Sequence, residues 1–405
     1  MISTMAWRNL WRHRRRTLLT AGSMGISVMV CIVMNGISVG FMEGLRAAVV
    51  DRQLGHVQLH HVDYPASASP YDTVPDASTL LAKLKADDGV TEAAPRVLGF
   101  GLFGGDGEEA ATGMFMGVDP AAESNLTGMA DRVTEGAWLS SSAPSAVIGY
   151  RLARDLKLAV GDELLVVTNA LDGSIGDRVY PVVGIYKTTN LALDDGAMFP
   201  LPVAQELLVL DDAIHEIVLL TEDADTIDEK LDGLTALVGD EVMLRPWWEI
   251  SPETVQMLGL QGVTILMFAV IIIGISAFLI INTLLMSVYE RTREFGVLAA
   301  VGTRPRQIVG LVLAESFLLA TLSALIGLGL GLPLDYYLAT KGLDLGMEEG
   351  FQLSGVVLDP HVYAEVTPDT VIVPVLALFL VGVVGGLWPA IRASRLDPVT
   401  AIRQD

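Results

Sequence analysis

The chain has 405 residues, of which 51% are apolar, and its formal net charge at pH 7 is −22. A mean hydropathy of +0.49 is high for a soluble protein, and the acidic balance argues against nucleic acid as a partner. Because Cys31 is the only cysteine, no disulfide can form within one chain. Any folded domain must therefore be stabilised by its own apolar core.

Four apolar stretches are each longer than the roughly 20 helical residues that cross a bilayer core. They predict transmembrane helices at 17–42, 258–289, 308–335 and 369–391. The gap between the first two, 43–257, is long enough for a folded domain. The predicted fold class is a membrane protein with four transmembrane α-helices and a large extracytoplasmic domain between helices 1 and 2.

Arginine and lysine lie unevenly beside these spans. The stretches 1–16, 290–307 and 392–405 hold twelve of the 26 basic residues, whereas 336–368 holds only Lys341. By the positive-inside rule, the basic N-terminal helix, the middle loop and the C-terminal tail are predicted to be cytosolic. The large domain and the last loop are then extracytoplasmic.

The extracytoplasmic domain at 43–257 is strongly acidic, with 36 Asp and Glu against 13 Lys and Arg, a net charge of −23. This excess either gives solubility and repulsion from anionic headgroups, or marks a cationic partner or a high-salt habitat. Mixed strand and helix patterns predict an α+β domain of two lobes. Predicted strands lie at 56–60, 112–118, 146–148, 164–168, 179–186 and 216–221, and predicted helices at 80–85, 204–210 and 226–237.

No catalytic, cofactor-binding or metal-binding residue is predicted in this chain. It lacks the phosphate-binding sequence Gly-x-x-x-x-Gly-Lys-Ser/Thr, and the Gly-x-Gly-x-x-Gly match at 99–104 leads into an acidic turn instead of a helix. His56, His60 and His61 resemble metal ligands in type, but a surface strand explains them better. We therefore expect no covalent chemistry from this chain.

The loop between the second and third spans predicts a short amphipathic helix. Its start is charged, and its apolar residues recur at the i, i+3 spacing of one helical face. Gly302 is expected to end this helix, and Pro305 to begin the next. The candidate site residues here are Glu290, Arg291, Arg293, Glu294, Phe295 and Leu298.

Two further features of the spans are candidates for function. Gly36, Gly40 and Gly44 follow a small-xxx-small spacing that lets another helix approach closely. Glu315 is a charge about two turns into the third span, where an ionisable group is costly. We expect it to reach the interface or to pair with an arginine; the alternative is a cargo or proton role.

The loop resembles the coupling motif of the FtsX-like permease superfamily of ABC transporters, which includes MacB-type permeases. The resemblance extends over nearly the whole chain and is strongest in the last third. The residues that carry it are the string 290–296 with Ala300-Val301-Gly302, the run Glu315-Ser316-Phe317-Leu318, the ending 388–399, the start 8–17, and Ile148-Gly149 with Val160-Gly161-Asp162 in the outer domain.

The resemblance implies a non-catalytic permease that works as a dimer, with a second copy or a paralogue, in a bacterial inner membrane. Separate cytosolic ATPase subunits would bind ATP and Mg and dock on the six loop residues. Closure of the two ATPase subunits on each other would move the outer domains of the permease. Gly36, Gly40 and Gly44 would pack the first span where an acyl chain of a membrane lipid or lipoprotein enters the dimer interface.

Three functions compete within this resemblance. Lipoprotein release is favoured by Met34-Asn35-Gly36 and Gly55-His56-Val57, which are similar to the lipoprotein-releasing permeases. The segment 169–178 is shorter than the hairpin expected for docking a carrier protein. The second candidate is a mechanotransmitter of an exporter with a periplasmic adaptor. The third is a regulator of cell-wall hydrolases, whose outer domain would be smaller.

Overall fold

The computed structural model describes residues 2–12, 14–64, 71–141, 143–188, 190–222, 224–344, 346, 351–353, 356–358 and 361–395. The chain forms two compact units. The first, here called the membrane unit, comprises Met1–Gly44, Met257–Gly346 and His361–Asp405. The second, here called the outer unit, comprises Leu45–Gln256 and Met347–Pro360. The end of the predicted tail, 396–405, lies outside the described residues.

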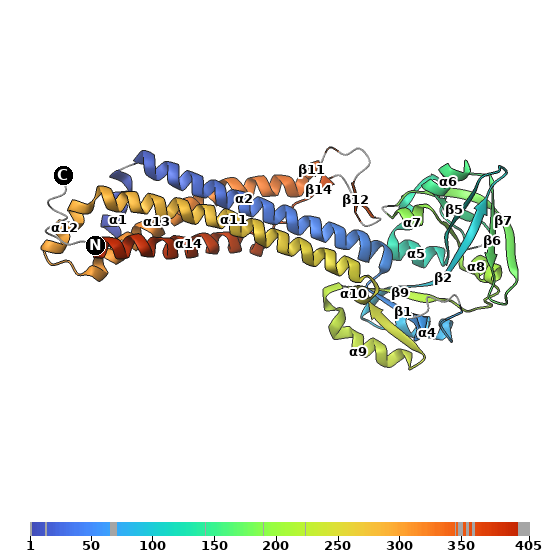
Figure 1. Ribbon diagram of the computed structural model, residues 1–405. Coiled ribbons are helices and arrows are strands. Elements are labelled where there is room, and N and C mark those ends of the chain that lie inside the picture. Colours follow the sequence, from blue (N-terminus) through green and yellow to red (C-terminus); the bar gives the residue numbers. More distant parts are fainter. Residues whose placement is uncertain are drawn as a thin grey trace. The chain divides into compact units, whose positions relative to one another are not determined.

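Four helices of the structure are long and apolar enough to cross a membrane (Figure 1). They are α2 (Arg14–Arg46), α11 (Pro252–Glu290), α13 (Pro305–Lys341) and α14 (Pro368–Ser394). The four predicted spans are confirmed, although each helix runs past the predicted ends. The preceding helix α1 (Ile2–Arg12) and the short α12 (Thr292–Ala300) complete the helices of this unit among the described residues.

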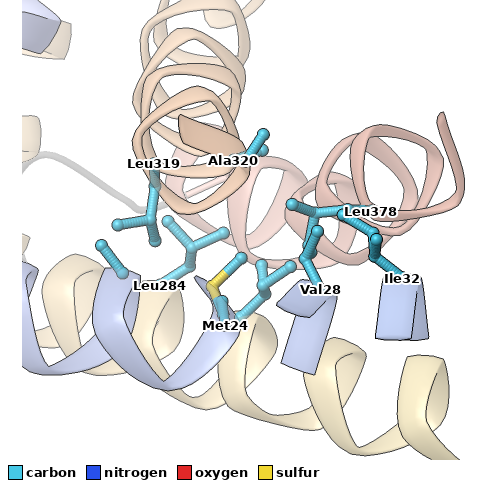
Figure 2. Close-up of a cluster of buried hydrophobic side chains, with 10 residues drawn as sticks. Met24, Val28, Ile32, Leu284, Leu319, Ala320 and Leu378 are labelled. Atoms are coloured by element: carbon cyan, nitrogen blue, oxygen red, sulfur yellow. The ribbon is translucent and has the colours of Figure 1, made fainter. Parts of the chain in front are cut away.

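A cluster of buried apolar side chains holds the four long helices together (Figure 2). Figure 2 shows Met24, Val28 and Ile32 of α2 facing Leu319 of α13 and Leu378 of α14. Half of the most apolar window of α13 is buried inside the unit, against 11% for α11. Helix α13 is therefore central, and most of α11 is left for lipid or another chain.

The outer unit is built on a ten-stranded mixed sheet in the order β10-β1-β9-β2-β3-β8-β5-β7-β4, with β6 against β2 and β7. The strands are β1 (Val57–His61), β2 (Val90–Gly104), β3 (Ala110–Val118), β4 (Val133–Gly136), β5 (Ala146–Gly149), β6 (Glu163–Asn169), β7 (Ile175–Tyr186), β8 (Ala197–Pro200), β9 (Glu216–Thr221) and β10 (Val242–Pro246). This sheet with its helices confirms the predicted α+β class.

Strand β2 joins the two lobes expected from the sequence. Its residues from Val90 to Arg96 pair with β9, and those from Arg96 to Gly104 pair with β3. The lobes therefore share one continuous sheet. The helices of the unit are η1 (Ala47–Leu54), α4 (Ala77–Lys85), α5 (Pro120–Thr127), η2 (Met129–Arg132), α6 (Tyr150–Leu156), α7 (Leu191–Asp194), α8 (Leu201–Leu208), η3 (Ala224–Thr226), α9 (Ile227–Val238) and α10 (Trp247–Ile250).

The glycine-rich run at 99–104 lies inside β2 and is not a phosphate-binding loop. Gly99 packs on the ring of Phe115, which a Cβ atom there would overlap. Sequence patterns did not predict β2, the longest strand, because glycine and Pro95 weaken the strand signal. The loop predicted at 336–368 is partly helical, since α13 runs to Lys341.

The prediction of a surface strand for the histidines near β1 is wrong, because His56 and His60 are buried and make hydrogen bonds within the protein. His56 contacts Thr221 Oγ1 through Nδ1 at 2.9 Å and Asp51 Oδ1 through Nε2 at 3.1 Å. The buried His60 lies 2.9 Å from Gln58 Oε1 through Nε2 and stacks on Tyr64. Burial lowers the pKa of His60, although Glu216 opposes the shift.

This lowered pKa predicts a loss of stability in mild acid. The unfolded chain binds a proton on His60 near the ordinary value of 6.5, whereas the folded chain resists protonation until the pH is lower. The stabilisation is therefore present above about pH 6.5 and is lost as the pH falls, at about 1.4 kcal/mol per unit of pKa difference. We expect His60→Gln to reduce the drop in Tm of the full-length protein between pH 7.5 and pH 5.5. The more exposed His61→Gln is the matched control, and an equal effect of both variants would contradict the assignment.

Candidate functional site

The candidate site is the predicted coupling helix, α12, which is fixed at both ends to membrane helices. The hydroxyl of Thr292 donates to the carbonyl of Val288 at 3.2 Å, which joins the start of α12 to the end of α11. Gly302 has a φ of 93°, a left-handed conformation that favours glycine, and it ends the helical turn after α12. Pro305 then opens α13. The predicted helix is thus present between rigid neighbours.

Arg291 is the centre of a buried ion network beneath α12. Its Nη1 donates to Glu315 Oε1 at 2.8 Å, and its Nε donates to Glu294 Oε2 at 2.9 Å. Asn9 Nδ2 donates to the same Glu315 oxygen at 2.7 Å. Burial alone would lower the pKa of Arg291, but the two carboxylates raise it above its ordinary value. Glu315 therefore pairs with Arg291, in agreement with the expectation that it reaches the interface or pairs with an arginine.

The basic N-terminal segment is bound to α12 and to the end of α11. Arg12 donates to the Glu294 carboxylate, and Arg16 Nη1 donates to Glu290 Oε2 at 2.6 Å. Burial raises the pKa of Glu294, but the hydrogen bonds from Arg291 and Arg12 outweigh it and lower the pKa below its ordinary value. These contacts join residues 282 and 274 positions apart, which no local sequence pattern signals. The network thus unites α1, α12 and α13, and Arg16 joins α2 to the end of α11.

The predicted site residues divide into an inward and an outward set. Arg291 and Phe295 are buried, so they pack against the chain's own helices, and Leu298 is half-buried. Arg293 is exposed on the opposite face. The structure adds two exposed residues to this face, Val297 and Val301, the latter 82% exposed. The positions 293, 297 and 301 recur at i, i+4 and i+8, a spacing that could have identified them from the sequence.

The glycines of α2 meet neighbouring backbone and side chains at two of their three positions. A Cβ atom at Gly36 would overlap the carboxylate of Asp335 on α13, and one at Gly40 would overlap the carbonyl of Tyr363. At Gly44 a Cβ atom would meet nothing within 4 Å among the described residues. Within this chain, the close approach therefore involves Gly36 and Gly40.

An apolar groove of about 290 Å³ lies between α2, α11 and α14. Helix α11 lines most of it, and the few polar side chains include Asn35 and Ser38 of α2. Cys31, the only cysteine, is also in its wall. A groove of this composition can hold a hydrocarbon chain but offers little to a charged ligand.

Comparisons with known proteins agree with this architecture. The family model of the MacB-like periplasmic core domain matches residues 17–237, and that of the FtsX-like permease C-terminal matches residues 266–398. The chain belongs to this family of ABC transporter permeases. The expected resemblance is confirmed.

Relatives of this permease carry different names. The lipoprotein-releasing system transmembrane protein LolC of Neisseria meningitidis is 24% identical over the full length of both chains. An uncharacterised ABC transporter permease of Methanocaldococcus jannaschii is 24% identical and covers 99% of this chain and 97% of its own. The pyoverdine export ATP-binding/permease protein of Pseudomonas fluorescens is 25% identical over 99% of this chain and 59% of its own. The periplasmic region of MacB from Actinobacillus actinomycetemcomitans covers 49% of this chain and 92% of its own, with a TM-score of 0.37.

Arg291→Met tests whether the buried network stabilises the permease. The variant leaves Glu315 buried without its cation, and removing one partner of a buried ion pair costs about 3–5 kcal/mol. We expect a lower Tm in detergent and less protein in the membrane. Arg293→Met removes the same charge from an exposed side chain and is the matched control. The double variant Arg291→Met/Glu315→Gln should recover part of the loss, and equal loss in Arg291→Met and Arg293→Met would contradict the role of the network.

Proposed function

We propose that this permease extracts lipoproteins from the inner membrane of a bacterium. Two permease chains, alike or unlike, assemble with separate ATPase subunits that bind ATP and Mg. Both termini and α12 face the cytosol, and the outer unit faces the periplasm. This orientation is supported by the basic residues beside the spans.

The observation that carries the proposal is the outward face of α12. Arg293 and Val297 of α12, and Val301 directly after its last residue, are exposed, and the buried Arg291 fastens this segment to α13. An exposed apolar and cationic patch is typical of a protein interface. Because α12 cannot move without α11 and α13, an ATPase that pushes on it displaces two membrane helices at once.

Lipoproteins are the favoured cargo because the groove between α2, α11 and α14 can accept an acyl chain. Helix α11 is exposed along most of its apolar length, so the groove borders lipid or a second permease chain. Full-length similarity to a LolC protein supports the same choice. The turn between β6 and β7 is only 170–174, which leaves recognition of a periplasmic carrier to a partner chain.

Export through a periplasmic adaptor is the second candidate. The similarity to the pyoverdine export protein covers 99% of this chain, which favours a shared mechanism of coupling. The short turn between β6 and β7 also agrees with a permease that binds no lipoprotein carrier.

Docking on the outward face of α12 is tested by Arg293→Glu and Val301→Glu. Both side chains are exposed, so we expect an unchanged Tm. Loss of an interface hot spot costs about 2 kcal/mol or more, so co-purification of the ATPase should fall at least about tenfold. Arg8→Glu makes the same charge change on α1 and should leave co-purification unchanged. Normal ATPase binding by both α12 variants would contradict the docking role.

Depletion of the permease in its host tests the choice of cargo. We expect lipoproteins to accumulate in the inner membrane when inner and outer membranes are separated and their lipoproteins are quantified. An outer-membrane β-barrel protein, which carries no lipid anchor, is the control and should be unchanged. Normal partition of lipoproteins would reject lipoprotein release and favour the exporter.

A further inference from the structure

The outer unit begins with a helical segment that continues α2 without a break. Helix α2 ends at Arg46, whose φ of −57° and ψ of −51° are helical, and η1 begins at Ala47. Segment η1 is a π-helix that ends before Gly55, where φ is 71°. The last turn of the first membrane helix is therefore part of the outer unit.

Arg96 of β2 binds this last turn from inside the outer unit. Its Nη1 donates to the main-chain carbonyl of Gln53 at 3.2 Å and to Glu216 Oε1 at 3.3 Å. Its Nε and Nη2 donate to the two oxygens of Glu123 at 2.8 and 2.7 Å, a bidentate pair. The main chain of Leu54 is held as well, because Gln58 Nε2 donates to its carbonyl at 2.7 Å.

The chemistry of this contact suits a helix end. The last carbonyls of a helix have no intrahelical donor and carry partial negative charge, so a guanidinium stabilises them. Burial would lower the pKa of Arg96, but the carboxylates of Glu123 and Glu216 outweigh burial and raise this pKa above its ordinary value. The guanidinium therefore stays charged. One side chain thus joins η1 to α5 through Glu123 and to β9 through Glu216.

A gain in stability does not by itself explain why ions are buried in this cluster. Arg96, Glu123 and Glu216 are each no more than 5% exposed, and well-packed apolar residues often stabilise a core as well as buried ions do. What the ions add is a directional connection that breaks only at a large cost. A second connection runs from Asp51 of η1 through His56 to Thr221 of β9.

We propose that Arg96 is the positioning residue that fastens the end of the first membrane helix to the sheet of the outer unit, so that displacement of α2 becomes displacement of that unit. This inference rests on the proposed function, since it needs an ATPase that moves the membrane helices. The role of Arg96 is to keep η1, α5 and β9 moving as one body.

The test measures two distances in the full-length permease with its ATPase in lipid nanodiscs. In a Cys31→Ser background, spin labels are placed on Tyr337 of α13 and on either Met34 of α2 or Asp172 of the outer unit, all three exposed. We expect trapping with ATP and vanadate to change both distances. The first reports movement of α2, and the second reports movement of the outer unit.

The triple variant Arg96→Met/Glu123→Gln/Glu216→Gln removes the connection without leaving a buried charge unpaired. We expect the α2 distance to change as before, while the fraction of molecules with a shifted outer-unit distance falls at least about twofold. Arg96→Lys gives a second test, because one ammonium cannot reach Glu123, Glu216 and the Gln53 carbonyl together. Its outer-unit shift should fall in the same direction.

A crosslink that replaces the Arg96 connection shows whether a lost outer-unit shift comes from the missing connection or from misfolding. Gln53 and Thr127 line one cavity of about 180 Å³, so cysteines are placed at both positions and treated with a short thiol-reactive crosslinker, while the two spin labels are carried by ketone-bearing residues that do not react with it. Crosslinking should restore the outer-unit shift in the Arg96→Lys variant. The matched control Arg151→Met/Asp195→Asn removes another ion pair of the outer unit, with an Nε–Oδ1 distance of 2.7 Å, and should leave the shift unchanged.

Two results would overturn the proposal, and they are distinguishable. A full outer-unit shift in both Arg96 variants would show that the connection is dispensable and would leave the proposed function intact. An outer-unit distance that never changes in the unmodified chain, although ATP is hydrolysed, would reject transmission of motion, and the role of Arg96 with it.

Discussion

The ion pair between Arg291 and Glu315 is the constraint on which the coupling site depends. It places a charge from the loop and a charge from α13 in contact 2.8 Å apart, both buried. Neither can move away without leaving the other charge buried and unpaired. Helix α12 is therefore a rigid extension of α13 and not an independent connector. The contacts from Asn9 and Arg12 extend the same constraint to the N-terminal helix.

A similar device recurs in the outer unit, where Arg96 holds a helix end against two carboxylates. In both places an arginine fork makes several charge-assisted hydrogen bonds at once, which a single ammonium cannot do. The chain contains only six lysines, and both buried connections use arginine. Each connection fixes one secondary-structure element against another, as the proposed transmission of movement would require.

The sequence predicted the four spans because hydrophobic length is a strong signal, and it predicted the strands in which polar and apolar residues alternate. It did not predict β2, where Gly99 makes room for the ring of Phe115 instead of adding a strand-forming side chain. It also placed Arg291 and Arg293 together in one docking set. Their separation into a buried and an exposed residue depends on Glu315 and Asn9, contacts distant in sequence that local patterns do not encode.

The groove bears on the energetics of the proposed function. Moving an acyl chain into water costs about 0.8 kcal/mol per CH₂ group, so a protein anchored by two chains does not leave the bilayer unaided. The groove, lined by Ile272 and its neighbours on α11 and by Val373 of α14, would keep such a chain in apolar surroundings after it leaves the lipid. The first step then exchanges one apolar environment for another and needs little work. The costly step is release from the groove, and that is where movement of α2, which forms one wall, would use the energy of ATP.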